Sequence, residues 1–163
     1  KRYLDKQARS TLLFVCTGNT CRSPMAAAIA RSLIGDDPLT IVASAGLAAG
    51  AGAPMTPEAR AALRGIGVEP GKHRSRALSE QDVRGADAVF AMTADHLAAL
   101  EGIGLRGGGR AELLDPSGAD VPDPIGGDQS EYDATCRRIE ELVRRRLEAS
   151  GLLPRATGPG DAS

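Results

Sequence analysis

Aromatic residues are nearly absent from this chain of 163 residues, which has two Phe, two Tyr and no Trp. Proteins that bind single-stranded nucleic acid stack the bases on aromatic side chains, and this chain has few to offer. An excess of one charge is lacking as well, because 20 Lys and Arg residues face 21 Asp and Glu residues. A basic stripe is the usual mark of a nucleic-acid-binding protein. The composition therefore predicts no nucleic-acid partner.

Long apolar runs are also lacking. The sequence has no segment of transmembrane length and no hydrophobic region of the signal-peptide kind. Cysteine is scarce, with three residues, an odd number that does not suggest a disulfide framework. We therefore expect a soluble protein of the cytoplasm, where thiols stay reduced, with no membrane partner.

The length corresponds to about one domain, which we place at residues 10–150. Residues 1–9 and 151–163 are expected to be flexible tails, and the protein to be a monomer. Short apolar segments predict strands at residues 12–16, 39–43, 86–92 and 111–114. Helices are predicted at residues 24–34, 56–64, 93–100 and 130–149. This alternation predicts an α/β fold, a single-domain three-layer sandwich with a four-stranded parallel sheet and helices on both faces.

The most informative segment is CTGNTCRS at residues 16–23, between the first strand and the first helix. Cys16 ends a strand, and ligands of parallel sheets bind at such carboxyl ends. Backbone N–H groups, a helix N-terminus and the planar guanidinium of Arg22 can together hold a phosphate. The same groups favour the thiolate of Cys16 as a nucleophile. We predict a phosphate-binding loop made of Thr17, Gly18, Asn19, Thr20, Cys21 and Ser23.

Two carboxylates are candidates for the general acid that must protonate the leaving group. Asp123 lies between two prolines, which hold it on a stiff loop after the fourth strand. Asp115 also precedes a proline, but it is the second choice because it lies nearer the end of that strand. We assign the general acid to Asp123, and its carboxylate can later act as the base that activates water.

Four segments together resemble the low-molecular-weight protein phosphatases. They are CTGNTCRSPMA from Cys16, SAG at residues 44–46, HRSR at residues 73–76, and the Asp-Pro loop before the last helix. The resemblance implies a small α/β fold with a four-stranded parallel sheet, a cysteinyl-phosphate intermediate, and neither metal nor other cofactor. It makes Cys16 the nucleophile, Arg22 the phosphate clamp and Asp123 the general acid. It also implies that the loop is braced by Asn19, Ser23, Ser44 and His73. Ser23 would in addition help the thiolate to leave.

Two residues bear on the choice of substrate. Family members that act on phosphotyrosine usually have an aliphatic residue in place of Thr20, and aromatic residues after the Asp-Pro pair, where this chain has Ile125. The combination resembles the protein-arginine-phosphatase branch. A guanidine leaving group is more basic than a phenolate and depends more on a general acid, so we expect Thr20 to orient Asp123. The predicted activity is hydrolysis of phosphoarginine in proteins, and the alternative is hydrolysis of phosphotyrosine.

Other interpretations remain open from the sequence. Cys21 is either a small loop residue or a thiol that pairs reversibly with Cys16 on oxidation. A zinc site from these two cysteines with His73 and His96 is disfavoured because no second closely spaced pair of ligands follows, and His96 is expected to face solvent. Related arsenate reductases use mid-chain cysteines, and residues 74–92 contain none. A phosphate-binding module without catalysis would be expected to lack one of the three catalytic residues.

Overall fold

Four parallel strands form a single sheet in the order β2-β1-β3-β4 in the computed structural model, which describes residues 10–104 and 111–153. The strands are β1 (Ser10–Cys16), β2 (Thr40–Gly46), β3 (Ala88–Ala91) and β4 (Ala111–Leu113). The helices are α2 (Arg22–Ile34), α3 (Pro57–Gly65), α4 (Glu80–Gly85), α5 (Ala94–Gly104) and α6 (Gln129–Ala149). The predicted α/β fold with a four-stranded parallel sheet is confirmed. The expected tails lie almost entirely outside the described residues, and the domain boundaries stay a prediction.

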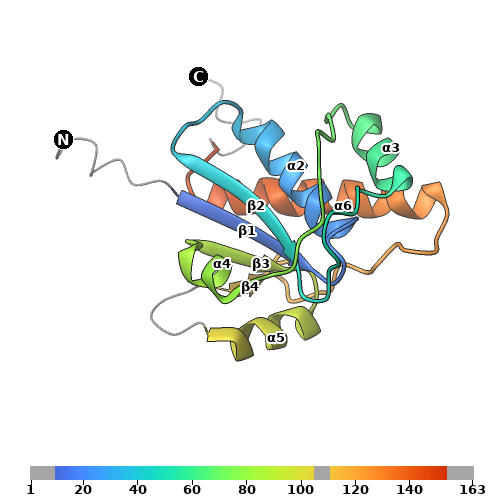
Figure 1. Ribbon diagram of the computed structural model, residues 1–163. Coiled ribbons are helices and arrows are strands. Elements are labelled where there is room, and N and C mark those ends of the chain that lie inside the picture. Colours follow the sequence, from blue (N-terminus) through green and yellow to red (C-terminus); the bar gives the residue numbers. More distant parts are fainter. Residues whose placement is uncertain (1–9, 105–110, 154–163) are drawn as a thin grey trace, which may run out of the picture.

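Helices cover both faces of the sheet (Figure 1). Successive residues of a strand point to opposite faces, and the central strand β1 shows the consequence. Leu12 and Phe14 belong to the core cluster that includes residues of α2, α3 and α6. Leu13 and Val15 belong to the cluster that includes residues of α4 and α5. All four side chains are buried, so the sheet is the middle layer of a sandwich with helices on both of its faces.

The carboxyl ends of β1 and β2 lie side by side, because Cys16 pairs with Gly46 in the parallel register. Beyond the strands, the N–H of Leu47 donates to the Cys16 carbonyl at 2.9 Å, and that of Ala48 donates to the Thr17 carbonyl at 3.0 Å. A side chain at Gly46 would place its Cβ 2.6 Å from the Thr17 carbonyl oxygen, so this close approach requires glycine. The predicted phosphate loop therefore lies at the edge of the sheet where α/β folds bind ligands.

Beyond shifts of one or two residues at the other boundaries, three elements differ from the expectation. The strand β2 continues to Gly46, beyond its predicted end at residue 43, because pairing with β1 extends to Cys16. The helix α4 was not predicted, and it begins with a capping box formed by Ser79 and Asp82. The helix α5 continues past the predicted end at Leu100.

Candidate active site

The candidate nucleophile, Cys16, is buried at the end of β1. The helix α2 begins at Arg22 with Cys21 as its N-cap residue, so residues 17–21 make up the whole loop between strand and helix. The helix was predicted from residue 24, but it already begins at Arg22, and the Ser23 hydroxyl points to the loop. Ser23 Oγ lies 2.9 Å from Cys16 Sγ. Ser23 is therefore placed to act on the thiol rather than on the end of the helix.

Asn19 holds the loop in shape from within. Its φ angle of 57° lies in the left-handed region, which Asn tolerates better than most residues. Its side-chain Nδ2 donates to Ser23 Oγ at 2.8 Å and to Ser44 Oγ at 3.0 Å. Its Oδ1 accepts from the backbone N–H of Arg76 at 3.0 Å, and its carbonyl accepts from His73 Nε2 at 2.7 Å. The structure thus brings the predicted bracing residues together around one asparagine.

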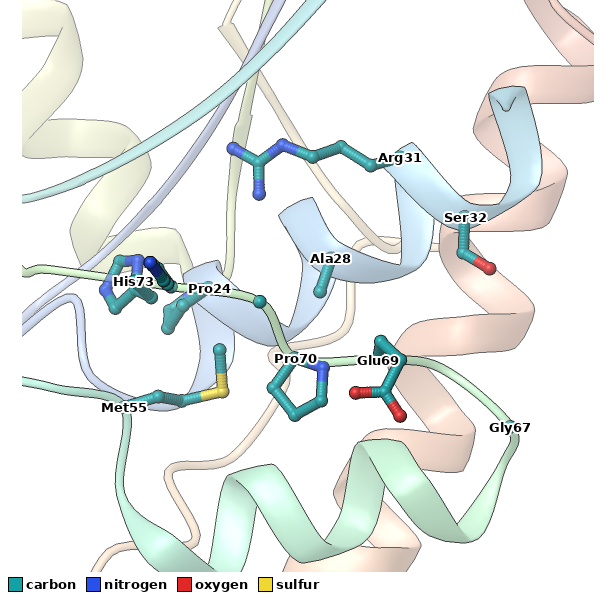
Figure 2. Close-up of a pocket in the computed structure, with 11 residues that line it drawn as sticks. Pro24, Ala28, Arg31, Ser32, Met55, Gly67, Glu69, Pro70 and His73 are labelled. Carbon is teal, nitrogen blue, oxygen red and sulfur yellow. The ribbon is translucent and has the colours of Figure 1, made fainter. Parts of the chain in front are cut away.

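His73 also borders a pocket of about 590 Å³ next to the loop (Figure 2). The pocket lies between α2, which contributes Pro24 and Arg31, and the segment that carries His73, with Met55 as an apolar wall. Burial lowers the pKa of His73, and the charge of Arg31 adds to this effect. The imidazole therefore favours its neutral form, in which Nε2–H still donates to the loop carbonyl.

Arg22 is 4% exposed and is held by the loop that carries the candidate acid. Its Nη1 donates to the Val121 carbonyl at 3.0 Å, and its Nη2 lies 3.4 Å from Asp123 Oδ2. Its Nε is buried and has no partner among the described residues. A buried donor without a partner is unfavourable, and an oxygen of a bound phosphate would supply one. The guanidinium is thus oriented for an anion at the loop.

Asp123 lies at the rim of the site, with its side chain 40% exposed. Its Oδ1 accepts from the Ile125 N–H at 3.1 Å and from the Cys21 thiol at 3.6 Å. The expectation that Thr20 orients this carboxylate is not met, since the Thr20 hydroxyl makes no hydrogen bond to it in the described part of the chain. The Cys21 thiol, next to Arg22 in the sequence, makes this contact with the carboxylate instead. The Thr20 carbonyl accepts from the Thr56 N–H at 3.0 Å instead.

Cys21 favours the protonated thiol in this site. Burial raises the pKa of Cys21 to about 12, and the nearby charges of Asp123 and Cys16 add to the rise. A protonated thiol can donate a hydrogen bond to the acid carboxylate, and a poorly ionised thiol is a weak nucleophile. Cys16, Cys21 and the buried Cys136 of α6 are all free. Reversible pairing of Cys21 with Cys16 stays a prediction.

Asp115, the second choice for the general acid, has a structural setting. It is 3% exposed and forms an ion pair with Arg138 of α6. Its Oδ1 accepts from the Ser117 hydroxyl at 2.7 Å and from the Ser117 N–H at 2.8 Å. These hydrogen bonds, with the Arg138 charge, lower the pKa of Asp115. A carboxyl group stabilised as the anion is a poor proton donor, so Asp115 is not suited to be the general acid. Its ion pair with Arg138 instead connects the segment after β4 to α6.

His96 is the site residue that the sequence did not reveal. It was expected to face solvent, but it is 7% exposed, and its Nε2 lies 2.8 Å from Thr17 Oγ1. It lies in the first turn of α5, directly after β3, and β3 is the neighbour of β1 in the sheet. The strand order would therefore have been the clue, because it places the start of α5 beside the phosphate loop.

The fold and this group of residues define a class of protein. The sequence pattern of the family described as "Low molecular weight phosphotyrosine protein phosphatase" matches residues 11–151. The chain belongs to this family, and it is a hydrolase, a protein phosphatase. Within residues 10–104 and 111–153, no helix is long and apolar enough to cross a membrane.

Relatives with two different substrates resemble the chain. The protein-arginine-phosphatase of Bacillus subtilis strain 168 is 38% identical over 141 residues, covering 82% of this chain and 92% of that protein. A low-molecular-weight protein-tyrosine-phosphatase of Streptomyces coelicolor is 34% identical over 151 residues, covering 83% of this chain and 90% of that protein. A solved structure of YwlE arginine phosphatase, a mutant with a phosphorylated active-site serine, matches with a TM-score of 0.77 and 36% identity. It covers 85% of this chain and 95% of that one.

Proposed function

We propose that this protein hydrolyses phosphoarginine in proteins through a cysteinyl-phosphate intermediate, without a cofactor. The observation that carries the proposal is the meeting of three groups at the carboxyl end of β1. They are the Cys16 thiol, the Arg22 guanidinium, whose Nε has no partner among the described residues, and the Asp123 carboxylate 3.4 Å from that guanidinium. A nucleophile, an anion clamp and a proton donor are what displacement at phosphorus requires.

In the first step, the Cys16 thiolate attacks phosphorus, and the bond from phosphorus to the guanidino nitrogen breaks. The backbone N–H groups of the loop and Arg22 bind the three non-bridging oxygens. Asp123, in its acid form, gives its proton to the departing nitrogen and becomes a carboxylate. The substrate protein leaves with a neutral or protonated arginine, and phosphorus is bound to sulfur.

In the second step, water attacks the phosphorus of the cysteinyl phosphate. The Asp123 carboxylate takes a proton from this water, the sulfur–phosphorus bond breaks, and its electron pair returns to Cys16. The Ser23 hydroxyl, 2.9 Å from Sγ, stabilises the thiolate as it leaves. Inorganic phosphate is released, and Asp123 is again in its acid form.

The surroundings of the acid support arginine as the phosphorylated residue. Ile125, the residue after Asp123-Pro124, is 61% exposed and gives the rim an apolar side chain with no ring to stack on a phenol. The carbonyl oxygen of the protonated Asp123 carboxyl group can accept a hydrogen bond from a guanidino N–H, and its O–H supplies the proton for the departing nitrogen. The similarity to a protein-arginine-phosphatase over most of both chains points the same way. The partner is then a phosphorylated protein, and the enzyme acts on it as a monomer.

The test compares one protein phosphorylated on arginine with the same protein phosphorylated on tyrosine. We expect kcat/KM of the purified enzyme to favour phosphoarginine by about tenfold or more, since a site that pairs with polar groups discriminates strongly. Cys16→Ser should abolish turnover and keep phosphate binding, and Asp123→Asn should slow phosphoarginine turnover about 10²–10⁴-fold. Faster hydrolysis of phosphotyrosine would assign the protein to the alternative activity.

A further inference from the structure

The first turn of α5 touches two loops that lie far apart in the sequence. On one side, His96 Nε2 lies 2.8 Å from the hydroxyl of Thr17, the first residue of the phosphate loop. On the other side, the backbone N–H of Ala94 donates to Asp120 Oδ1 at 2.8 Å. Asp120 belongs to the loop that carries the acid, Asp123. One helical turn therefore holds both the loop of the nucleophile and the loop of the acid.

The burial of His96 shows that its contact with the loop is specific. The residue is 7% exposed, and its Nδ1 is buried without a partner among the described residues. An unpaired buried nitrogen is unfavourable, so a histidine without another stabilising contact would be expected to face solvent. The other ring nitrogen instead contacts Thr17, which directly follows Cys16. This hydrogen bond fixes the side chain of the first residue of the loop.

The acid loop is fixed to the same corner of the sheet. The N–H of Val121 donates to the carbonyl of Met92, the residue directly after β3, at 2.8 Å. The carbonyl of Val121 accepts from Arg22 Nη1 at 3.0 Å. Asp123 follows within a stiff Pro-Asp-Pro segment, so its position depends on where Asp120 and Val121 are held.

We propose that His96 and Asp120 are positioning residues, which together set the spacing between the Cys16 thiolate and the Asp123 carboxyl group. The proposal rests on the function proposed above, since it requires Asp123 to be the general acid. His96 holds the phosphate loop, and Asp120 holds the acid loop, each from the first turn of α5. Neither side chain touches the reacting atoms.

The charges around His96 make it a neutral partner rather than a second cation for the phosphate. The charged groups that act on it are Arg22 and the carboxylates of Asp95, Asp120 and Asp123. Burial lowers the pKa of His96, the charge of Arg22 lowers it further, and the three carboxylates offset part of the effect. The imidazole therefore acts through its hydrogen bond to Thr17 at neutral pH.

The acid arm is tested with two substrates that differ in their need for a proton. Asp120→Ala should lower kcat for a phosphoarginine protein about tenfold, because small displacements of a catalytic group cost that much or more. It should leave kcat for 2,4-dinitrophenyl phosphate nearly unchanged, since that leaving group departs without protonation. Asp120→Asn keeps the acceptor oxygen and should restore the wild-type ratio. Equal losses on both substrates would overturn the positioning role.

The loop arm is tested through binding of inorganic phosphate. His96→Ala should weaken competitive inhibition by phosphate about tenfold, the usual effect of one lost hydrogen bond and its consequences, whereas His96→Gln keeps a polar group near Nε2 and should restore it. Asp95→Ala changes an exposed residue of the same turn and serves as the matched control. Thr17→Val, which keeps the volume of Thr17, should reproduce the loss even if His96→Ala fails to fold. Wild-type inhibition in Thr17→Val would overturn this arm.

Failure of the proposed function and failure of this inference give different results. If Asp123→Asn leaves phosphoarginine turnover unchanged, Asp123 is not the acid, and the proposed function fails with it. If Asp123→Asn slows turnover but Asp120→Ala and His96→Ala behave as wild type, only the positioning roles are wrong. A thermal unfolding curve of each variant, with a Tm above the assay temperature, shows that folded enzymes are being compared.

Discussion

At the scale of single residues, Ser23 has a hydrogen-bonding geometry that assigns the direction of its proton. Asn19 Nδ2 donates to Ser23 Oγ at 2.8 Å, so that oxygen already acts as an acceptor. The hydroxyl proton is then free to point at Cys16 Sγ, 2.9 Å away. A donor at this place stabilises sulfur as an anion more than sulfur bonded to phosphorus, because hydrogen bonds to charged groups are the stronger ones. Ser23 should therefore matter most when the thiolate departs.

Ser23→Ala should slow the breakdown of the cysteinyl phosphate about 10- to 100-fold, the equivalent of one hydrogen bond to a charged group. Its formation should be slowed less, so the phosphoenzyme should accumulate. Rapid mixing with an aryl phosphate would show this as a burst of leaving group followed by a slow steady state. Ser44→Ala is the matched control, since Ser44 accepts from Asn19 but, in the part of the chain that the structure describes, forms no hydrogen bond with Cys16. A steady state without a burst would contradict the role of Ser23.

Ile125 offers a test of selectivity at the same scale. It is 61% exposed beside the acid, so a larger ring fits there without repacking the core. Ile125→Tyr should raise kcat/KM for phosphotyrosine proteins about 2- to 10-fold, the range of one added aromatic contact. Ile41→Tyr, at a 40% exposed position of β2, adds the same ring elsewhere and should change nothing. An unchanged ratio of the two substrates in Ile125→Tyr would exclude Ile125 as a selectivity residue.

At the scale of secondary-structure elements, substitution of Asp115 tests whether its carboxylate is structural or catalytic. Asp115→Asn removes the charge that faces Arg138 and disturbs the hydrogen bonds from Ser117. We expect the free energy of unfolding to fall by about 1–3 kcal/mol, as for a buried polar group left without its partners. The variant, assayed below its melting temperature, should keep full kcat. Arg138→Ala should cost less, because Arg138 is 45% exposed. A large loss of kcat in Asp115→Asn would restore Asp115 as a candidate acid.

The elements themselves were largely predictable from the sequence, whereas several contacts between them were not. Apolar runs and cap residues located all four strands and the helices other than α4, and Thr56, at the start of the predicted segment, caps α3 by accepting from the Ala59 N–H. The short helix α4 has one buried residue, Val83, too few to give a periodic pattern. The contact of His96 with Thr17 depends on strand order. The contact of Cys21 with Asp123 depends on where α2 begins, a boundary that local propensity does not fix.

At the scale of the whole molecule, buried titratable groups on both sides of neutrality define the pH range in which the fold is most stable. His73 and His96 have pKa values lowered from the ordinary 6.5, chiefly by burial. As the pH falls through 6.5, the unfolded chain binds protons that the folded chain refuses, so stability falls with the pH. Burial raises the pKa of Cys21 and of Cys136 from the ordinary 9.0 to about 12. Above pH 9 the unfolded chain loses protons that the folded chain keeps, so stability falls as the pH rises.

The free energy of unfolding should therefore form a plateau between about pH 6.5 and pH 9 and decline on both sides of it. Urea unfolding at a series of pH values measures this curve directly. His96→Gln removes one of the two imidazoles whose pKa is lowered, the more deeply buried one, and should make the acid decline shallower, whatever it does to the height of the plateau. Cys136 lies in the middle of α6 and takes no part in the proposed reaction. Cys136→Ala should make the alkaline decline shallower. A maximum on the acidic side of pH 6.5, or slopes that neither variant changes, would mean that these buried groups do not govern the stability of the folded protein.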